Sequence, residues 1–291
     1  MKKLLSILAV SLFATVTVSA QSAEADTAQS PFRGVDNIAK KEHIANKKGI
    51  PYVHVREADV MWSKTIWRII DMREKMNLPL YYPTKPVDDR KSLVNVMYDA
   101  IGHGELTAYD ANIGFGHEFE RRMEFKEVQE KMGAGIDTLE VRNPDTGLYE
   151  KQVVTQEADL SSAKKLLIKE VWYFDKKYTR MDVRIIGICP IIEREVNEER
   201  VDQILGFWVY FPELRPFLMK QEAYNTKNES QRDSFDDLFA KRRFGSYVYA
   251  EANVYDNRTI LDMAQGITDT NLEAERIKAV LFQKEHDVWE F

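Results

Sequence analysis

Few residues in this sequence have the types and the spacing that a catalytic or metal-binding site requires. His117 and Glu118 resemble the beginning of the H-E-x-x-H motif, in which two imidazoles one helical turn apart chelate zinc. The position of the second imidazole is occupied by Arg121. Because that ligand is missing, we interpret His117 as a surface or supporting residue and predict no zinc site.

Two other features lack a group that their chemistry needs. Residues 110–112 resemble the beginning of a calcium loop, but Phe115 stands where the loop needs glycine, and Arg121 where it needs a bidentate glutamate. We therefore predict an ordinary Asx turn. Cys189, the single cysteine, lies in an apolar stretch in which a free thiol behaves as a small hydrophobic group. The sequence also contains no nucleophile elbow and no phosphate-binding glycine loop, so we predict no catalytic residue, metal or cofactor.

Aromatic and arginine side chains, by contrast, gather in dense patches. The aromatic patches are Trp62 and Trp67, Tyr81 and Tyr82, Trp172 to Phe174, Trp208 to Phe211, and Trp289 and Phe291. Any one of these residues is more often part of a hydrophobic core than of an interface. Their number, together with Arg215, Arg242 and Arg243, favours extensive contacts with other proteins, because these residue types concentrate binding energy.

The N-terminus has the pattern of an export signal. Lys2 and Lys3 precede an apolar run from residue 4 to residue 18, and small residues follow up to Ala20. We predict a signal peptide over residues 1–20 with cleavage after Ala20. The run has about 15 residues, whereas a membrane-spanning helix needs roughly 20. Residue 21 is glutamine rather than the cysteine of a lipoprotein, so we expect neither a membrane span nor an attached lipid.

Charge argues against nucleic acid as a partner. The chain has 41 basic and 47 acidic residues, and without the two lysines of the signal its net charge is −8. A protein with that excess of acidic groups is not expected to bind a polyanion. We interpret the basic clusters at 40–41, 47–48 and 241–243 as solvated faces or as contacts to acidic protein. With one cysteine, an exported chain of this length must be stabilised by burial of apolar surface.

The ordered body is expected to begin at residue 50. Residues 21–30 have no large apolar side chain, and such side chains remain sparse up to Gly49, so we predict a flexible arm over residues 21–49. The first element expected in the body is a helix over residues 57–76. Its apolar residues are too many for one stripe, which indicates that the helix is covered on two sides.

The strongest strand signals lie at residues 166–174 and 181–189. The second of these becomes apolar on both faces, as in a central strand. A hairpin is predicted for residues 139–142 and 148–154. The other predicted elements are helices over 92–101 and within 119–131, a strand over 204–211, a helix after Pro212 with Pro216 in its first turn, and helices capped by Ser234 with Asp237 and by Thr270 with Glu273. These elements predict an α+β fold over residues 50–291, with an antiparallel or mixed sheet and several packed helices, in one unit or in two tightly docked halves.

From about Val55 to the C-terminus the sequence resembles the GldN/PorN family. The resemblance rests on six motifs: residues 56–77 (READVMWSKTIWRIIDMREKMN) with 79–83 (PLYYP), 169–175 (KEVWYFD), 181–188 (MDVRIIGI), 234–237 (SFDD), 241–244 (KRRF) and 253–256 (NVYD). It implies a periplasmic ring beneath the outer membrane that works in type IX protein secretion and, in gliding species, in motility. It also implies an outer-membrane lipoprotein partner, GldK/PorK, and contact with the GldL/GldM motor through a GldM/PorM-like periplasmic component. The family has no established catalytic residues.

The resemblance thus places the protein in the periplasm, held at the outer membrane by a lipoprotein partner. For a ring, each subunit needs two different patches that meet head to tail. Our hypothesis is that the subunit or partner surfaces include Tyr81, Tyr82, Arg242, Arg243, Trp289 and Phe291. Two alternatives remain open, an outer-membrane-associated binding protein and a diverged periplasmic hydrolase with a site at His103, Glu105, His117 and Glu118.

Overall fold

The computed structural model describes residue 44 and residues 46–87, 90–142, 149–197, 200–225, 228, 230–263 and 266–289. The predicted signal peptide, the predicted arm up to residue 43 and Phe291 lie outside these residues. Within the described chain, no helix combines the length and the apolar character needed to cross a membrane.

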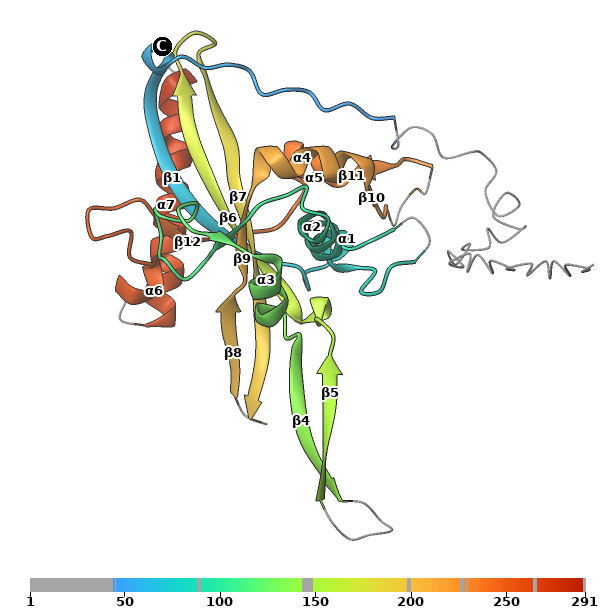
Figure 1. The fold of residues 1–291 in the computed structure, drawn as a ribbon. Coiled ribbons are helices and arrows are strands. Elements are labelled where there is room, and N and C mark those ends of the chain that lie inside the picture. The colour runs from blue at the N-terminus through green and yellow to red at the C-terminus, as the bar shows by residue number, and fades with distance from the viewer. Residues whose placement is uncertain are drawn as a thin grey trace, which may run out of the picture. The chain divides into compact units, whose positions relative to one another are not determined.

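The described residues form an antiparallel sheet of eight strands with helices packed on it (Figure 1). The strand order is β12-β1-β6-β7-β9-β2-β3, and β8 pairs with β7. The strands are β1 (Val60–Asp71), β2 (Ala108–Asp110), β3 (Arg122–Met123), β6 (Ala163–Asp175), β7 (Arg180–Asn197), β8 (Arg200–Leu205), β9 (Phe207–Tyr210) and β12 (Tyr247–Glu251). The predicted α+β class, with a sheet and several packed helices, is confirmed.

The predicted helix over residues 57–76 is wrong, because most of this segment is the strand β1. A short 3-10 helix, η1 (Glu57–Asp59), precedes it. Ile66 and Ile70 point to one face of the sheet, and Trp67 and Ile69 point to the other, where they join a different buried cluster. Burial on both faces removes the two-residue period, so the pattern resembled a helix covered on two sides. The β-branched and aromatic residues of the segment favour the strand.

The predicted strands at 166–174 and 181–189 are confirmed as parts of β6 and β7, which pair along most of their length. Leu167 lies opposite Cys189, and both side chains are fully buried. Burial raises the pKa of the Cys189 thiol, so this residue acts as a small hydrophobic group, as predicted. The predicted strand over 204–211 corresponds to the end of β8 and to β9, with Gly206 between them.

Helices cover one face of the sheet at two places. The helices are α1 (Leu78–Tyr81), α2 (Leu93–Gly102), α3 (Phe125–Lys131), α4 (Phe211–Lys220), α5 (Phe235–Ala240), α6 (Ile260–Met263) and α7 (Ile267–Trp289). Leu93, Leu214 and Phe235 of α2, α4 and α5 share a cluster with Ile168 of β6. Ile277 of α7 packs instead with residues of β1 and β12. In Figure 1, α7 therefore lies beside β1, and α4 and α5 lie on the other side of β7.

The helix starts predicted at Ser92 and Ser234 are confirmed, whereas those predicted from Thr270 and Pro216 are wrong. Ser234 and Asp237 form the predicted capping box of α5. The helix α7 begins at Ile267, so Thr270 is already helical, and its hydroxyl donates to the Gly266 carbonyl. Pro216 lies past the first turn of α4, inside the helix. It is exposed, so water can reach the carbonyl that its missing N–H would have bonded.

The predicted hairpin is confirmed as β4 (Gly135–Arg142) and β5 (Tyr149–Gln156), which form a two-stranded sheet of their own. It stands apart from the central sheet in Figure 1. The predicted turn residues 143–147 lie outside the described residues. A second small ladder joins β10 (Glu222–Ala223) to β11 (Asp233–Ser234).

Candidate protein interface

The structure separates the residues that resembled a zinc motif. His117 is exposed, and its Nδ1 lies 2.6 Å from Oε1 of Glu120, which raises the pKa of His117. Glu118 is buried. Its Oε1 accepts a hydrogen bond from Trp67 Nε1 at 2.8 Å, and its Oε2 accepts one from Lys169 Nζ at 2.6 Å. His117 and Glu118 therefore face different partners. Across the described chain, no group of three or more His, Cys, Asp or Glu side chains is arranged to hold a metal ion.

The segment that resembled a calcium loop is the predicted Asx turn, since Asp110 Oδ1 accepts from the Asn112 N–H at 3.1 Å. The same carboxylate pairs with Arg121 at 3.0 Å and with Lys131 at 2.8 Å. Burial acts to raise the pKa of Asp110, but these partners outweigh it and leave the pKa lowered. The Asp110 carboxylate is thus already paired with two basic side chains of the protein, rather than arranged as a calcium ligand.

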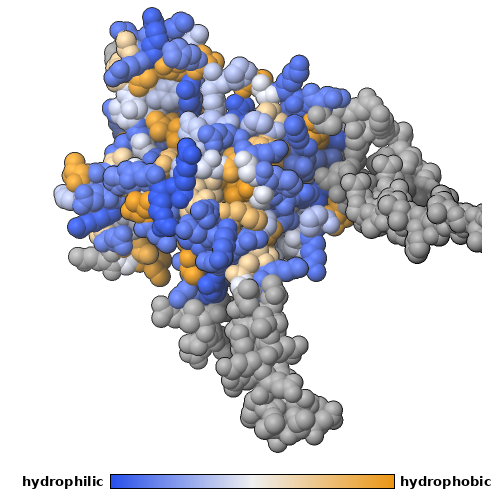
Figure 2. Space-filling view, viewed as in Figure 1, coloured by the Kyte–Doolittle hydropathy of each residue, from blue (hydrophilic) through white to orange (hydrophobic). Residues whose placement is uncertain are grey.

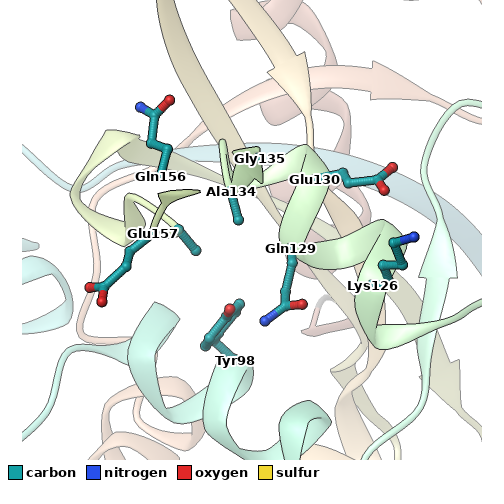
Figure 3. Close-up of a pocket in the computed structure, with 9 residues that line it drawn as sticks. Tyr98, Lys126, Gln129, Glu130, Ala134, Gly135, Gln156 and Glu157 are labelled. Atoms are coloured by element: carbon teal, nitrogen blue, oxygen red, sulfur yellow. The ribbon is translucent and has the colours of Figure 1, made fainter. Parts of the chain in front are cut away.

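A cavity of about 650 Å³ lies where the β4–β5 hairpin meets α2 and α3. Figure 3 shows the side chains of Tyr98 and Gln129 directed into this space, and Lys126 and Glu130 turned away from its centre. None of the described residues that line it is a histidine, serine or cysteine. The described lining therefore contains neither a Ser–His nor a Cys–His pair.

Arg242 occupies an unusual position at the end of α5. Its φ of 51° is left-handed, which costs a residue other than glycine roughly 1 kcal/mol. Its Nη2 donates to Oε2 of the fully buried Glu170 at 3.1 Å, and its Nη1 lies 3.0 Å from Oε1 without hydrogen-bond geometry. The guanidinium also lies over the rings of Trp172 and Phe244. Arg242 therefore joins the loop after α5 to the strand β6.

Arg242 also lines a groove between the sheet and α7, with a volume of about 410 Å³. We call this hollow the Arg242 groove. Trp172 and Phe244 line it from the sheet side, and Lys278 and Phe282 line it from α7. Phe282 is 68% exposed. Aromatic groups beside cations are typical of protein interfaces.

Arg243 and Lys241 have different surroundings from Arg242. Both pair with the buried Asp233, Lys241 at 2.8 Å, while about half of each basic side chain stays exposed. Burial acts to raise the pKa of Asp233, but the hydrogen bonds from Lys241 and Arg243 outweigh it, so the pKa is lowered. Of the two arginines predicted at the interface, Arg243 is thus the more accessible.

The remaining predicted interface residues lie elsewhere on the chain. The Tyr81 hydroxyl donates to the Ser161 carbonyl at 2.8 Å, and Tyr82, 54% exposed, packs edge-to-face on the Tyr81 ring. Trp289 is the last residue of α7. In the described part of the chain, no aromatic or charged contact joins the two tyrosines to Arg242 or Arg243.

An extended segment before β1, residues 46–56, crosses the edge of β7, and we call it the strap. Lys47 Nζ donates to Ser234 Oγ at 2.9 Å and to the Asp237 carboxylate. The ring of Tyr52 lies under the guanidinium groups of Arg215 and Arg184, at 4.5 and 5.3 Å. Residues 46–49 fall within the predicted flexible arm, and the apolar pattern gave no sign of these polar contacts.

The contacts of Asp237 predict a change in stability at low pH. Burial alone would raise its pKa, but hydrogen bonds from Lys47 and Ser234 lower the pKa to about 2. A carboxyl with a lowered pKa stabilises the fold above its unfolded pKa and loses this effect as pH falls, here between about pH 4 and pH 2. Over that range the free energy of unfolding of the wild type should fall by roughly 2 kcal/mol more than that of Asp237→Asn. Urea unfolding at pH 5, 4, 3 and 2 measures the difference, and parallel curves for the two proteins would contradict it.

Comparison with known proteins identifies the family. The family described as "Gliding motility associated protein GldN" matches residues 55–290. No curated protein matches the sequence. The match includes β1, the β6–β7 pair, Arg242 with Glu170, and the helix α7. The chain therefore belongs to the GldN family, a family of gliding-motility and type IX secretion components.

Proposed function

We propose that the protein is a non-catalytic ring subunit of the type IX secretion and gliding machinery in the periplasm. In this proposal it assembles with a GldK/PorK-like outer-membrane lipoprotein, and it contacts the GldL/GldM motor through a GldM/PorM-like periplasmic component. The observation that carries the proposal is the family match over residues 55–290, nearly the whole body. The export signal predicted over residues 1–20 supports the compartment.

The surface chemistry supports binding rather than turnover. The cavity at the hairpin base is lined, in its described part, by amide, carboxylate, ammonium and phenol groups without an imidazole or thiol. The Arg242 groove presents aromatic rings and cations between two rigid elements, a sheet and a helix. Side chains fixed on such elements lose little freedom on binding, and this favours stable protein contacts.

The lipoprotein contact predicts the effect of one substitution. Arg243→Glu should weaken recovery of the lipoprotein partner, because it reverses an exposed charge while Lys241 still pairs with Asp233. Envelope fractions from cells with the tagged protein would be solubilised in mild detergent, and the co-purified lipoprotein quantified. Lys126→Glu, an exposed charge reversal on α3, is the matched control and should behave as wild type.

Two outcomes would count against the proposal. Equal recovery with Arg243→Glu would remove Arg243 from the contact. A wild-type protein that brings down no envelope protein, and that stays in the soluble periplasmic fraction whether or not the lipoprotein is present, would contradict the assembly role itself.

A further inference from the structure

The connection between β12 and α6 is an ordered loop that contains the NVYD motif. The Asn253 side chain accepts a hydrogen bond from the Tyr255 N–H at 2.9 Å, and the Asn257 side chain accepts one from the Asn253 N–H at 3.2 Å. Asn257 Nδ2 also donates to the Phe115 carbonyl at 3.2 Å, which fixes the loop to the body. Asp256 and Asn257 are both left-handed, with φ of 56°. The loop is therefore held in one conformation before any partner arrives.

This ordered loop presents apolar side chains to solvent. Val254 is 89% exposed and Tyr255 is 62% exposed. The neighbouring α6 and the first turns of α7 continue the surface, and orange groups mark the left edge of Figure 2, where α6 and the loop lie in Figure 1. We call this the α6 surface, and its exposed apolar residues are Val254, Tyr255, Leu261, Met263, Ile267 and Leu272. So many exposed apolar side chains in 19 consecutive residues mark an interaction site.

The α6 surface carries mainly negative charge. Its exposed acidic residues are Asp256, Asp262, Asp269 and Glu275, and its exposed basic residues are Arg258 and Arg276. A protein that covers this surface needs apolar groups at its centre and basic groups around them.

The tip of the β6–β7 hairpin, with the adjoining strap, has the complementary composition. We call this end the tip surface. Met61, Tyr178 and Val53 are 74%, 50% and 49% exposed. The exposed basic residues here are Arg56, Lys176, Lys177 and Arg180, and the exposed acidic residue is Glu57. Arg56 pairs with Asp59 and Arg180 pairs with Asp182, whereas Lys176 and Lys177 stand at the turn of the hairpin. The Lys176 N–H donates to the Asp59 carbonyl at 2.8 Å, so the hairpin tip lies beside η1, which directly follows the strap.

The two surfaces lie at opposite ends of α7. Ile267 begins the helix beside α6, whereas Lys284 and Asp287, near its end, line a hollow with Met61 and Thr179 of the tip. At 1.5 Å per residue, Ile267 and Asp287 lie roughly 30 Å apart along α7. Figure 1 shows the helix running between them. One copy therefore cannot cover its own α6 surface with its own tip.

We infer that the α6 surface of one copy docks on the tip surface of the next copy. This inference rests on the proposed ring and names the two faces that build it. Two different surfaces that meet head to tail form a heterologous contact, and such contacts build a ring when the rotation from one copy to the next closes. The opposite charges orient successive copies, and burial of Val254 and Tyr255 against Met61 and Tyr178 supplies the apolar centre of the contact.

Cross-linking of paired cysteines tests the inference. In the double variant Val254→Cys with Tyr178→Cys, a short bis-maleimide added to intact cells should give a ladder of covalent oligomers. Each single variant should stay monomeric, because like faces do not meet. Cys189 is fully buried and should not react. A dimer from Val254→Cys alone would show that the contact is isologous and would overturn the inference.

Charge reversal provides an independent test. Asp269→Lys with Glu275→Lys, or Lys176→Glu with Lys177→Glu, should each abolish the ladder, and the four substitutions in one chain should restore it. If the double-cysteine variant gives no ladder while sedimentation still shows oligomers, these two faces are wrong and the ring proposal stands. If the protein sediments as a monomer and also fails to recover the lipoprotein, both proposals fail.

Discussion

Replacing Lys169 by methionine is expected to lower the free energy of unfolding by about 3–5 kcal/mol. Lys169 Nζ lies 2.6 Å from Oε2 of Glu118, whose side chain is 1% exposed. The ammonium of Lys169 also lies over the rings of Trp67 and Phe119, at 5.4 and 5.9 Å from their centroids. Methionine retains most of the side-chain volume but leaves the Glu118 carboxylate without a cation. A buried charge that loses its partner keeps its desolvation cost and loses the attraction that offset it. Urea unfolding followed by tryptophan fluorescence measures the change.

A second substitution separates charge from packing at this site. In Lys169→Met with Glu118→Gln, the amide oxygen can still accept from Trp67 Nε1, which Glu118 bonds at 2.8 Å, and no charge remains. This double variant should recover most of the lost stability. A loss below about 1 kcal/mol for Lys169→Met alone is typical of an exposed ion pair and would show that water reaches Glu118.

The fold could be predicted where the local sequence pattern is typical of only one kind of secondary structure. The β6 and β7 segments are rich in β-branched and aromatic residues and are joined by a short polar turn, which favours strands. The Ser234 capping box needs only groups within four residues. The pattern failed at β1, where Ile66 and Trp67 are both buried, on opposite faces of the sheet. A sequence with two buried faces carries no period from which helix and strand can be told apart.

The candidate interface was less predictable, because distant residues decide which side chains are free. Arg242 and Arg243 are neighbours of the same type, and the sequence assigned them the same role. The partner of Arg242 is Glu170, 72 positions away, and the partner of Arg243 is Asp233, ten positions away. One signal was available, since Lys169 and Glu170 interrupt an apolar strand and charges at such positions need buried partners.

Arg242→Met is expected to cost about 3 kcal/mol of unfolding free energy, and Arg243→Met under about 1 kcal/mol. The first change leaves the fully buried Glu170 with Trp172 Nε1 at 3.2 Å as its remaining hydrogen-bond donor, and Arg68 supplies part of the missing positive charge. The second leaves Asp233 paired with Lys241. Thermal unfolding of the two purified variants beside wild type measures both effects.

The comparison decides which arginine is suited to report on partner binding. If Arg242→Met unfolds at a much lower temperature than wild type, any reduced recovery of the lipoprotein with this variant would follow from unfolding. Only substitutions of Arg243 would then report on the partner contact. Arg242→Lys refines the test, because a single ammonium cannot reach both Glu170 oxygens and lacks the planar face that lies over Trp172. It should fall between wild type and Arg242→Met. Equal stability of wild type, Arg242→Lys and Arg242→Met would mean that water already solvates the Glu170 carboxylate. Arg242 would then again be a candidate for the partner surface.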